Sequence, residues 1–254
     1  DRKTNTAQVM DYPWNENYDV ELFGKSDRAG YNFVVEAGAE PTAPAAVTDF
    51  AVAQTPNVLE AVVSFKAPTK TVAGDDLTDL TKIDVLRDGN VINSISPSIN
   101  WVAADQGYEN SQDITSIDFG AGLTAALAQN DASTHPRYWA NDKSLRLYDK
   151  NSMTISGGVI KKVVFTFVSS SNNKLAAEGL VVDGATGTWT GSANEIAFTA
   201  TGGKAFIQKI EIEYEGTLTL GAEYSYTDNA EDLTIGTHVY QVIPYNASGI
   251  GIKS

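Results

Sequence analysis

The chain has 254 residues, 42% hydrophobic and 20% charged, which is typical of a globular protein with one large or two ordinary domains. Its 32 acidic residues outnumber 18 Lys and Arg, and a net charge of −14 disfavours nucleic acid and anionic lipid as partners. The chain has no cysteine, which excludes disulfides, zinc–thiolate sites and thiol nucleophiles. No apolar run approaches the roughly 18–20 residues of a membrane span, so no direct membrane insertion is expected.

The first 40 residues read as an extended segment that contains a β-hairpin. Two alternating runs within Tyr18–Glu36 flank a polar turn at Lys25–Gly30. The segment Ala37–Ala46 comes next, with small residues and two prolines that favour an extended connector. A lone hairpin is unstable in water, so residues 1–40 either complete a preceding domain or pack onto the domain C-terminal to them. The abrupt start at Asp1 suggests a mature protein or an excised segment.

Beyond the connector, strand patterns dominate. Runs of β-branched and aromatic residues are bounded by Gly, Asn, Asp or Ser, as is typical of sandwiches and barrels. Helical periodicity is limited to Leu123–Gln129, which suggests at most a short helix. The clearest strand predictions are Val62–Lys66, Ile83–Arg87, Lys162–Val168, Glu195–Thr199, Gln208–Tyr214 and Val239–Ile243. The fold class is therefore all-β.

Two segments that lie far apart resemble the two halves of a fibronectin type III domain of Bacteroidetes surface and secreted proteins. The first half runs from Ala45 to Ile92 and ends in the turn motif R-D-G-x-x-I, which begins at Arg87. The second half, Glu223–Gly249, resembles strands E and F and the F–G loop. The resemblance implies that Phe65 is the core aromatic of strand B, in place of the usual tryptophan, and Tyr240 the core tyrosine of strand F.

The resemblance gives a domain plan. Neither half could bury a core alone, so we expect residues 41–96 and 216–254 to fold together as one immunoglobulin-like sandwich. Residues 97–215 would be looped out between the halves as an inserted domain. Short sequence motifs within this segment, such as Gly187–Gly191 (GTWTG), resemble those of a jelly-roll-like β-sandwich module found in the same class of proteins. The resemblance to surface and secreted proteins implies that the chain is extracellular or at the outer-membrane surface, and that the parent protein is secreted or lipid-anchored.

Aromatic residues of the insert are candidates for glycan binding. Sugar rings stack on exposed aromatic side chains, while neighbouring amides and carboxylates bind their hydroxyl groups. The alternative is that these rings fill the core, which is also the simpler interpretation of Trp189 between its glycines. The candidate ligand-binding set is Trp101, Tyr108, Tyr138, Trp139, Asn141 and Asp142.

Carboxylates at the start of the insert are candidates for a structural calcium site. Calcium needs six to eight converging oxygen atoms, and loop carboxylates can supply them. The residues are Asp105, Glu109 and Asp113, which lack the EF-hand spacing and could equally be solvated turns. Similar clusters at Asp75–Asp79 and Asp228–Asp232 are interpreted as turns and strand caps.

Catalytic motifs are lacking, so the sequence predicts a protein that is not an enzyme and needs no cofactor. His135 and His238 fall in different predicted modules, and His238 is interpreted as a surface residue before strand F. No nucleophile elbow, zinc-binding helix or P-loop occurs. The predicted function is a structural or adhesion module, with a glycan or another surface protein as partner. The alternative is a carbohydrate-binding module in which the inserted domain binds the glycan.

Overall fold

The computed structural model describes residues 40–254, and the hairpin predicted over Tyr18–Glu36 lies outside them. The described chain consists of antiparallel β-sheets and one short 3-10 helix, η2 (Ala103–Gln106), so the all-β prediction is confirmed. No helix in this part of the chain is long and apolar enough to cross a membrane.

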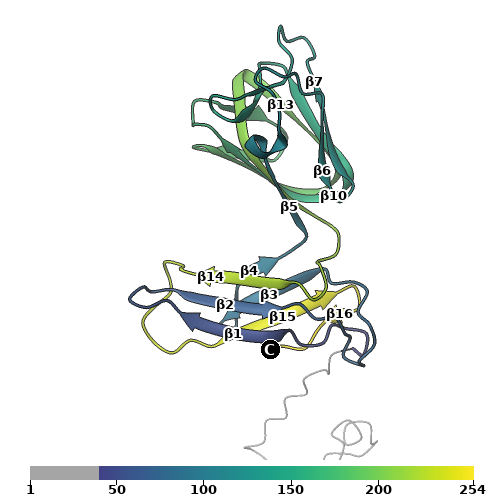
Figure 1. The fold of residues 1–254 in the computed structure, drawn as a ribbon, viewed down its shortest axis with the longest axis vertical. Helices are drawn as coiled ribbons and strands as arrows, with labels where there is room; N and C mark the ends of the chain where they lie inside the picture. Colours follow the sequence, from purple (N-terminus) through teal and green to yellow (C-terminus); the bar gives the residue numbers. More distant parts are fainter. Residues whose placement is uncertain (1–39) are drawn as a thin grey trace, which may run out of the picture. The chain divides into compact units, whose positions relative to one another are not determined.

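Two small sheets contain strands from both ends of the described chain (Figure 1). A three-stranded sheet has the order β1-β2-β14, and a four-stranded sheet has the order β16-β15-β3-β4. All their neighbouring strands pair antiparallel. The bounds are β1 (Thr48–Gln54), β2 (Ala61–Lys66), β3 (Lys82–Arg87), β4 (Asn90–Ile95), β14 (Glu223–Asp228), β15 (Tyr240–Asn246) and β16 (Gly249–Ile250). Strands on either side of the 97–215 segment thus share both sheets.

One hydrophobic cluster joins these two sheets. In β2, Val63 and Phe65 are buried while Val62, Ser64 and Lys66 are partly exposed, the alternation of a strand with one face on a core. They lie in one cluster with Ile83 of β3 and Val242 of β15. Because the first pair belongs to the three-stranded sheet and the second pair to the four-stranded sheet, the core lies between the sheets.

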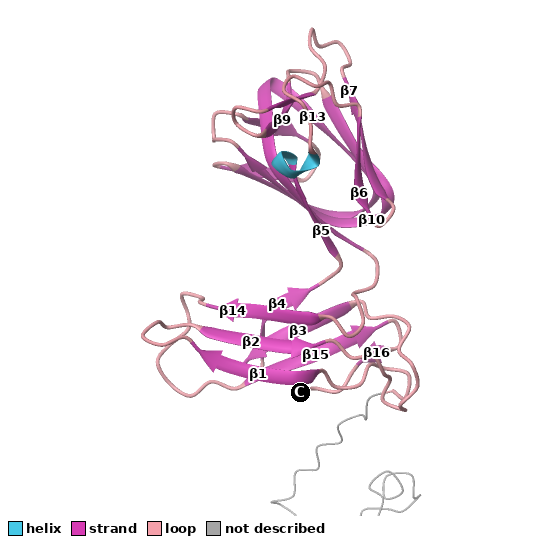
Figure 2. Cartoon of the chain, viewed as in Figure 1, coloured by secondary structure: helices cyan, strands magenta, loops and turns pink. Residues whose placement is uncertain are grey.

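The segment between β4 and β14 forms a nine-stranded sheet that curls strongly into a half-barrel (Figure 2). Its cluster of buried residues is separate from that of the small sheets and includes Phe165 and Phe198, whose rings meet edge-on at 4.8 Å. The bounds are β5 (Ser98–Val102), β6 (Ser116–Gly120), β7 (Leu123–Ala128), β8 (Arg137–Trp139), β9 (Ser144–Leu147), β10 (Ser152–Phe167), β11 (Asn173–Ala176), β12 (Leu180–Asp183) and β13 (Thr186–Tyr214).

The long strand β10 changes partners along its length. Residues 152–156 pair with β7 on one edge and with residues 199–195 of β13 on the other. Residues 162–166 pair with residues 190–186 on one edge and 213–209 on the other. In each pairing with β13 the partner number falls as the β10 number rises, which is the register of antiparallel strands. Two stretches of β13 therefore enclose the second half of β10.

The short helix suggested at Leu123–Gln129 is wrong, because this segment is strand β7. Leu123, Ala125 and Leu127 are buried, and the residues between them are exposed. Alanine and leucine favour a helix by propensity, but the period-two alternation fits pairing with β6 and β10. Tertiary pairing therefore outweighs local preference here.

A close backbone approach marks the bend of β10. Gly157 has φ +108°, and a Cβ atom there would lie 2.1 Å from the carbonyl oxygen of Gly122. A residue with a side chain is therefore disfavoured at position 157 for two reasons: the positive φ suits glycine, and the space for a Cβ atom is already occupied. The bend depends on glycine at this position.

We expect Gly157→Ala to lower the free energy of unfolding by about 3 kcal/mol, because overpacking and backbone strain add. Gly202→Ala is the matched control: its φ is +69°, but a Cβ there meets nothing within 4 Å. Its loss should be about 1 kcal/mol. Urea unfolding measures both, and equal losses would contradict the close approach.

Candidate functional site

Most of the predicted glycan-binding aromatics are used for packing. Trp101, Tyr138 and Trp189 are 3%, 6% and 6% exposed and belong to the core of the half-barrel. The indole Nε1–H of Trp189 donates to the carbonyl oxygen of Glu178 at 3.1 Å, as expected for a structural plug. Tyr108 packs against Tyr138 with 5.8 Å between ring centroids, and burial raises the pKa of the Tyr108 hydroxyl.

Trp139 is the exception, since it is only partly buried. The guanidinium carbon of Arg146 lies 4.7 Å from the Trp139 ring and 4.1 Å from the Phe206 ring. Asp142 forms an ion pair with Arg146, and Asn141 is exposed nearby in sequence. The structure therefore brings Trp139 and Asp142 together around Arg146, a residue outside the predicted set.

The three carboxylates predicted to bind calcium do not form a metal site. Within residues 40–254 no group of three or more His, Asp or Glu side chains is arranged to hold a metal ion. Asp113 instead pairs with Arg137 at 2.9 Å, while Asp105 and Glu109 are exposed. Their spacing in sequence does not make their oxygen atoms converge, which calcium requires.

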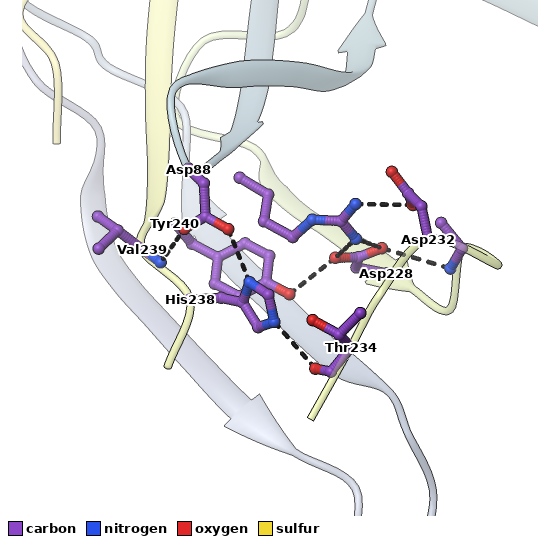
Figure 3. A network of polar contacts seen from close by, with 9 residues as sticks. Asp88, Asp228, Asp232, Thr234, His238, Val239 and Tyr240 are labelled. Atoms are coloured by element: carbon purple, nitrogen blue, oxygen red, sulfur yellow. Dashed lines mark hydrogen bonds and ion pairs between the residues drawn. The ribbon is translucent and has the colours of Figure 1, made fainter. Parts of the chain in front are cut away.

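A polar network lies where β3, β14 and β15 meet (Figure 3). Arg87, at the end of β3, donates through Nη1 to both carboxylate oxygens of Asp228, at 3.1 and 2.9 Å. Arg87 is 7% exposed and Asp228 fully buried. Because β3 and β14 belong to different sheets, this ion pair, in which one guanidinium nitrogen contacts both carboxylate oxygens, joins the two sheets across the core.

Two further side chains contact this ion pair. The hydroxyl of Tyr240 donates to Asp228 Oδ2 at 2.7 Å, and Arg87 Nη2 pairs with Asp232 at 2.7 Å. Burial, and then the bond to Asp228, raise the pKa of Tyr240 to about 12. The hydrogen bond from Arg87 lowers the pKa of Asp232. Tyr240 therefore remains a neutral hydrogen-bond donor to Asp228 at neutral pH.

His238 extends the network into the β14–β15 loop, residues 229–239. Its Nδ1 lies 2.7 Å from Asp88 Oδ2, and its Nε2 lies 2.9 Å from the carbonyl oxygen of Thr234. The backbone N–H of Val239 donates to Asp88 Oδ1 at 2.8 Å. The side chain of His238 is 17% exposed, so it lies at the surface before β15, as predicted, but is partly covered by its contacts.

An apolar groove lies beside this loop. Its volume is ≈530 Å³, and it is formed by the β14–β15 loop, β1, β2 and the turn that joins them. Unusually exposed apolar side chains line it, Ile235 at 96%, Leu59 at 47% and Val52 at 44%. His238 and Tyr240 line the same groove, so the polar network forms part of its wall.

Sequence reasoning missed Asp228 as a buried residue, although a signal was present. In β14 the partly buried Tyr224 and Tyr226 precede Asp228 at intervals of two, so all three face the same side. A carboxylate at the third inward position needs a buried cation. Arg87, at the end of β3, is that cation, but nothing in its local sequence distinguishes it from a solvated arginine.

Comparison with models of known protein families found no match, and searches of curated proteins and of solved structures found none either.

The two carboxylates on Arg87 provide a matched test. Asp228→Ala leaves a buried guanidinium without its main partner and should lower the free energy of unfolding by about 3 kcal/mol. Asp232→Ala removes a carboxylate that is 77% exposed, so the stability should change little. Thermal unfolding of both variants at pH 7 measures the difference. Comparable stability of the two would contradict the role assigned to the Arg87–Asp228 pair.

Proposed function

We propose that the chain is a non-catalytic extracellular module of a bacterial cell-surface or secreted protein, with a structural or adhesive role. In this proposal the two small sheets are a fibronectin type III sandwich, and residues 97–215 are an inserted, jelly-roll-like β-sandwich that it displays. The strand orders support the assignment, since β1-β2-β14 and β16-β15-β3-β4 correspond to strands A-B-E and G-F-C-C′ of that family.

The observation that carries the proposal is the double connection between the small sheets and the half-barrel. The strand pairing of β5 with β13 extends to Ser98 and Glu213. One residue further on each side, the N–H of Tyr214 donates to the carbonyl oxygen of Pro97 at 3.1 Å. The two connecting segments are therefore hydrogen-bonded to each other close to the point where they leave the half-barrel.

The returning segment is also anchored in the core of the small sheets. Leu218 is 8% exposed and belongs to their hydrophobic cluster. Its N–H donates to the carbonyl oxygen of Leu80 at 2.6 Å. Two paired segments, one of them anchored by a buried side chain, resist bending and twisting more than a single polar linker would. Such a connection suits an element that displays one module on another.

The carbohydrate-binding alternative has weaker support. A sugar platform needs an aromatic face open to solvent. Of the three tryptophans in the insert, Trp101 and Trp189 are buried, and Arg146 lies over the ring of Trp139. Most of the aromatic rings proposed to bind a glycan therefore pack against other side chains of the protein.

A rigid connection predicts that both parts tumble together. Nitrogen-15 relaxation should give one rotational correlation time for amides of residues 48–95 and 223–250 and for amides of residues 98–214. A control variant with four Gly/Ser residues inserted after Ser96 and again after Gly216 should give two different and shorter times. Two distinct times in the unmodified chain would overturn the display role.

Glycan binding is tested with Trp139→Ala and the control Tyr148→Ala, since Tyr148 is a partly exposed aromatic outside the predicted set. On an array of soluble polysaccharides we expect no specific binding by the unmodified chain. Strong binding to one polysaccharide that Trp139→Ala abolishes and Tyr148→Ala preserves would replace the structural role with the carbohydrate-binding alternative.

A further inference from the structure

The two ring nitrogens of His238 both face atoms that accept hydrogen bonds. The carbonyl oxygen of Thr234 can only accept, and the carboxylate of Asp88 accepts when it is ionised. Asp88 is held ionised, because the N–H of Val239 and then His238 itself lower the pKa of its carboxyl group. A neutral imidazole has a single N–H and can make only one of these two bonds. Only the imidazolium form can therefore make both hydrogen bonds at once.

We propose that His238 is a pH-dependent latch, whose imidazolium fastens the β14–β15 loop to the β3–β4 turn and whose neutral form releases that loop. The proposal is independent of the display role above. The latch joins residues from different parts of the chain, since 150 positions separate His238 from Asp88. It also closes the loop on itself through Thr234, four residues before His238.

Other contacts restrict the release to the tip of the loop. Leu233 is 6% exposed, and its N–H donates to the carbonyl oxygen of Ala230 at 3.0 Å. Two hydrogen bonds join Val239 to Asp88, one from the N–H of Val239 to the carboxylate and one from the N–H of Asp88 to the carbonyl oxygen of Val239. Residues 234–237 between these anchors are exposed, and the latch is the contact that spans them. Loss of the proton therefore loosens the tip while the sheets stay intact.

The charges around His238 favour the protonated ring. Asp88 attracts it from the β3–β4 turn, while Arg87 repels it from the end of β3. Asp228 of β14 and Asp232 of the loop pair with Arg87 and offset its charge, and Tyr240 of β15 remains neutral.

The partly exposed Glu60 lines the same groove just before β2 and adds negative charge. The pKa of His238 is raised, chiefly by its hydrogen bond to Asp88 and then by that to Thr234.

The sign of the pH dependence is set by this elevation. A group whose pKa is higher in the folded protein stabilises it fully below the unfolded value, about 6.5 for histidine. That stabilisation is lost as the pH rises through the elevated pKa of the folded state. Thr234, Ile235 and Gly236 belong to the released segment and line the apolar groove, so the groove changes its shape over the same pH interval.

NMR titration of the full chain tests the latch. The ring signals of His238 should titrate at a higher pH than those of His135, the exposed second histidine. Amide exchange of residues 234–237 and the methyl shifts of Ile235 should follow the His238 midpoint. Each unit of pKa elevation corresponds to a tenfold increase in loop opening when the proton is lost. A common midpoint for both histidines, or a loop insensitive to it, would overturn the proposal.

Two variants isolate the contact. Asp88→Asn keeps an acceptor for the N–H of Val239 but removes the charge, so the His238 midpoint should fall toward about 6.5. His238→Gln should abolish the pH dependence of loop exchange, and His135→Gln should leave it unchanged. If His238→Gln retains the pH dependence, the latch lies elsewhere and the proposal fails. The titration of the unmodified chain decides the question even if His238→Gln does not fold.

Discussion

The ion pair between Arg87 and Asp228 is the constraint on which the small sheets depend. Its two members lie 141 positions apart, on strands of different sheets, and both are buried. A buried charge without its partner is strongly unfavourable, so the pair stabilises only the arrangement in which β3 and β14 face each other. The chain between them must then fold with its two ends close together.

The half-barrel meets that requirement through its own strand pairing. β5 opens the segment and the end of β13 closes it, and the two are hydrogen-bonded neighbours. A compact unit whose first and last strands pair can be inserted between two strands of another fold without separating them. The pairing of β5 with β13 lies at the junction itself, whereas β4 and β14 separate the Arg87–Asp228 pair from it.

The same ion pair also organises the groove. Asp228 accepts from Tyr240, and Asp232 reaches Arg87 from the β14–β15 loop, so one guanidinium links β14, β15 and the loop. His238 and Asp88 then hold the loop against the β3–β4 turn. Ile235 is exposed at the tip of the loop, between the buried Leu233 and the polar contacts that His238 and Val239 make with Asp88.

The sequence by itself determined the all-β class, the net negative charge and several strands, such as β2, β3 and β15, because alternation and turn residues act locally. It misjudged Leu123–Gln129, where composition suggests a helix and pairing makes a strand. It also proposed six glycan-binding residues and three calcium ligands without a means to tell which would be buried. Only the tertiary structure decided that Arg87 pairs with Asp228. It also decided that the Arg146 guanidinium lies near the rings of Trp139 and Phe206. In the same way, it placed both ring nitrogens of His238 next to hydrogen-bond acceptors. These contacts join residues whose local sequences carry no sign of one another, and their energies exist only once the strands between them have paired.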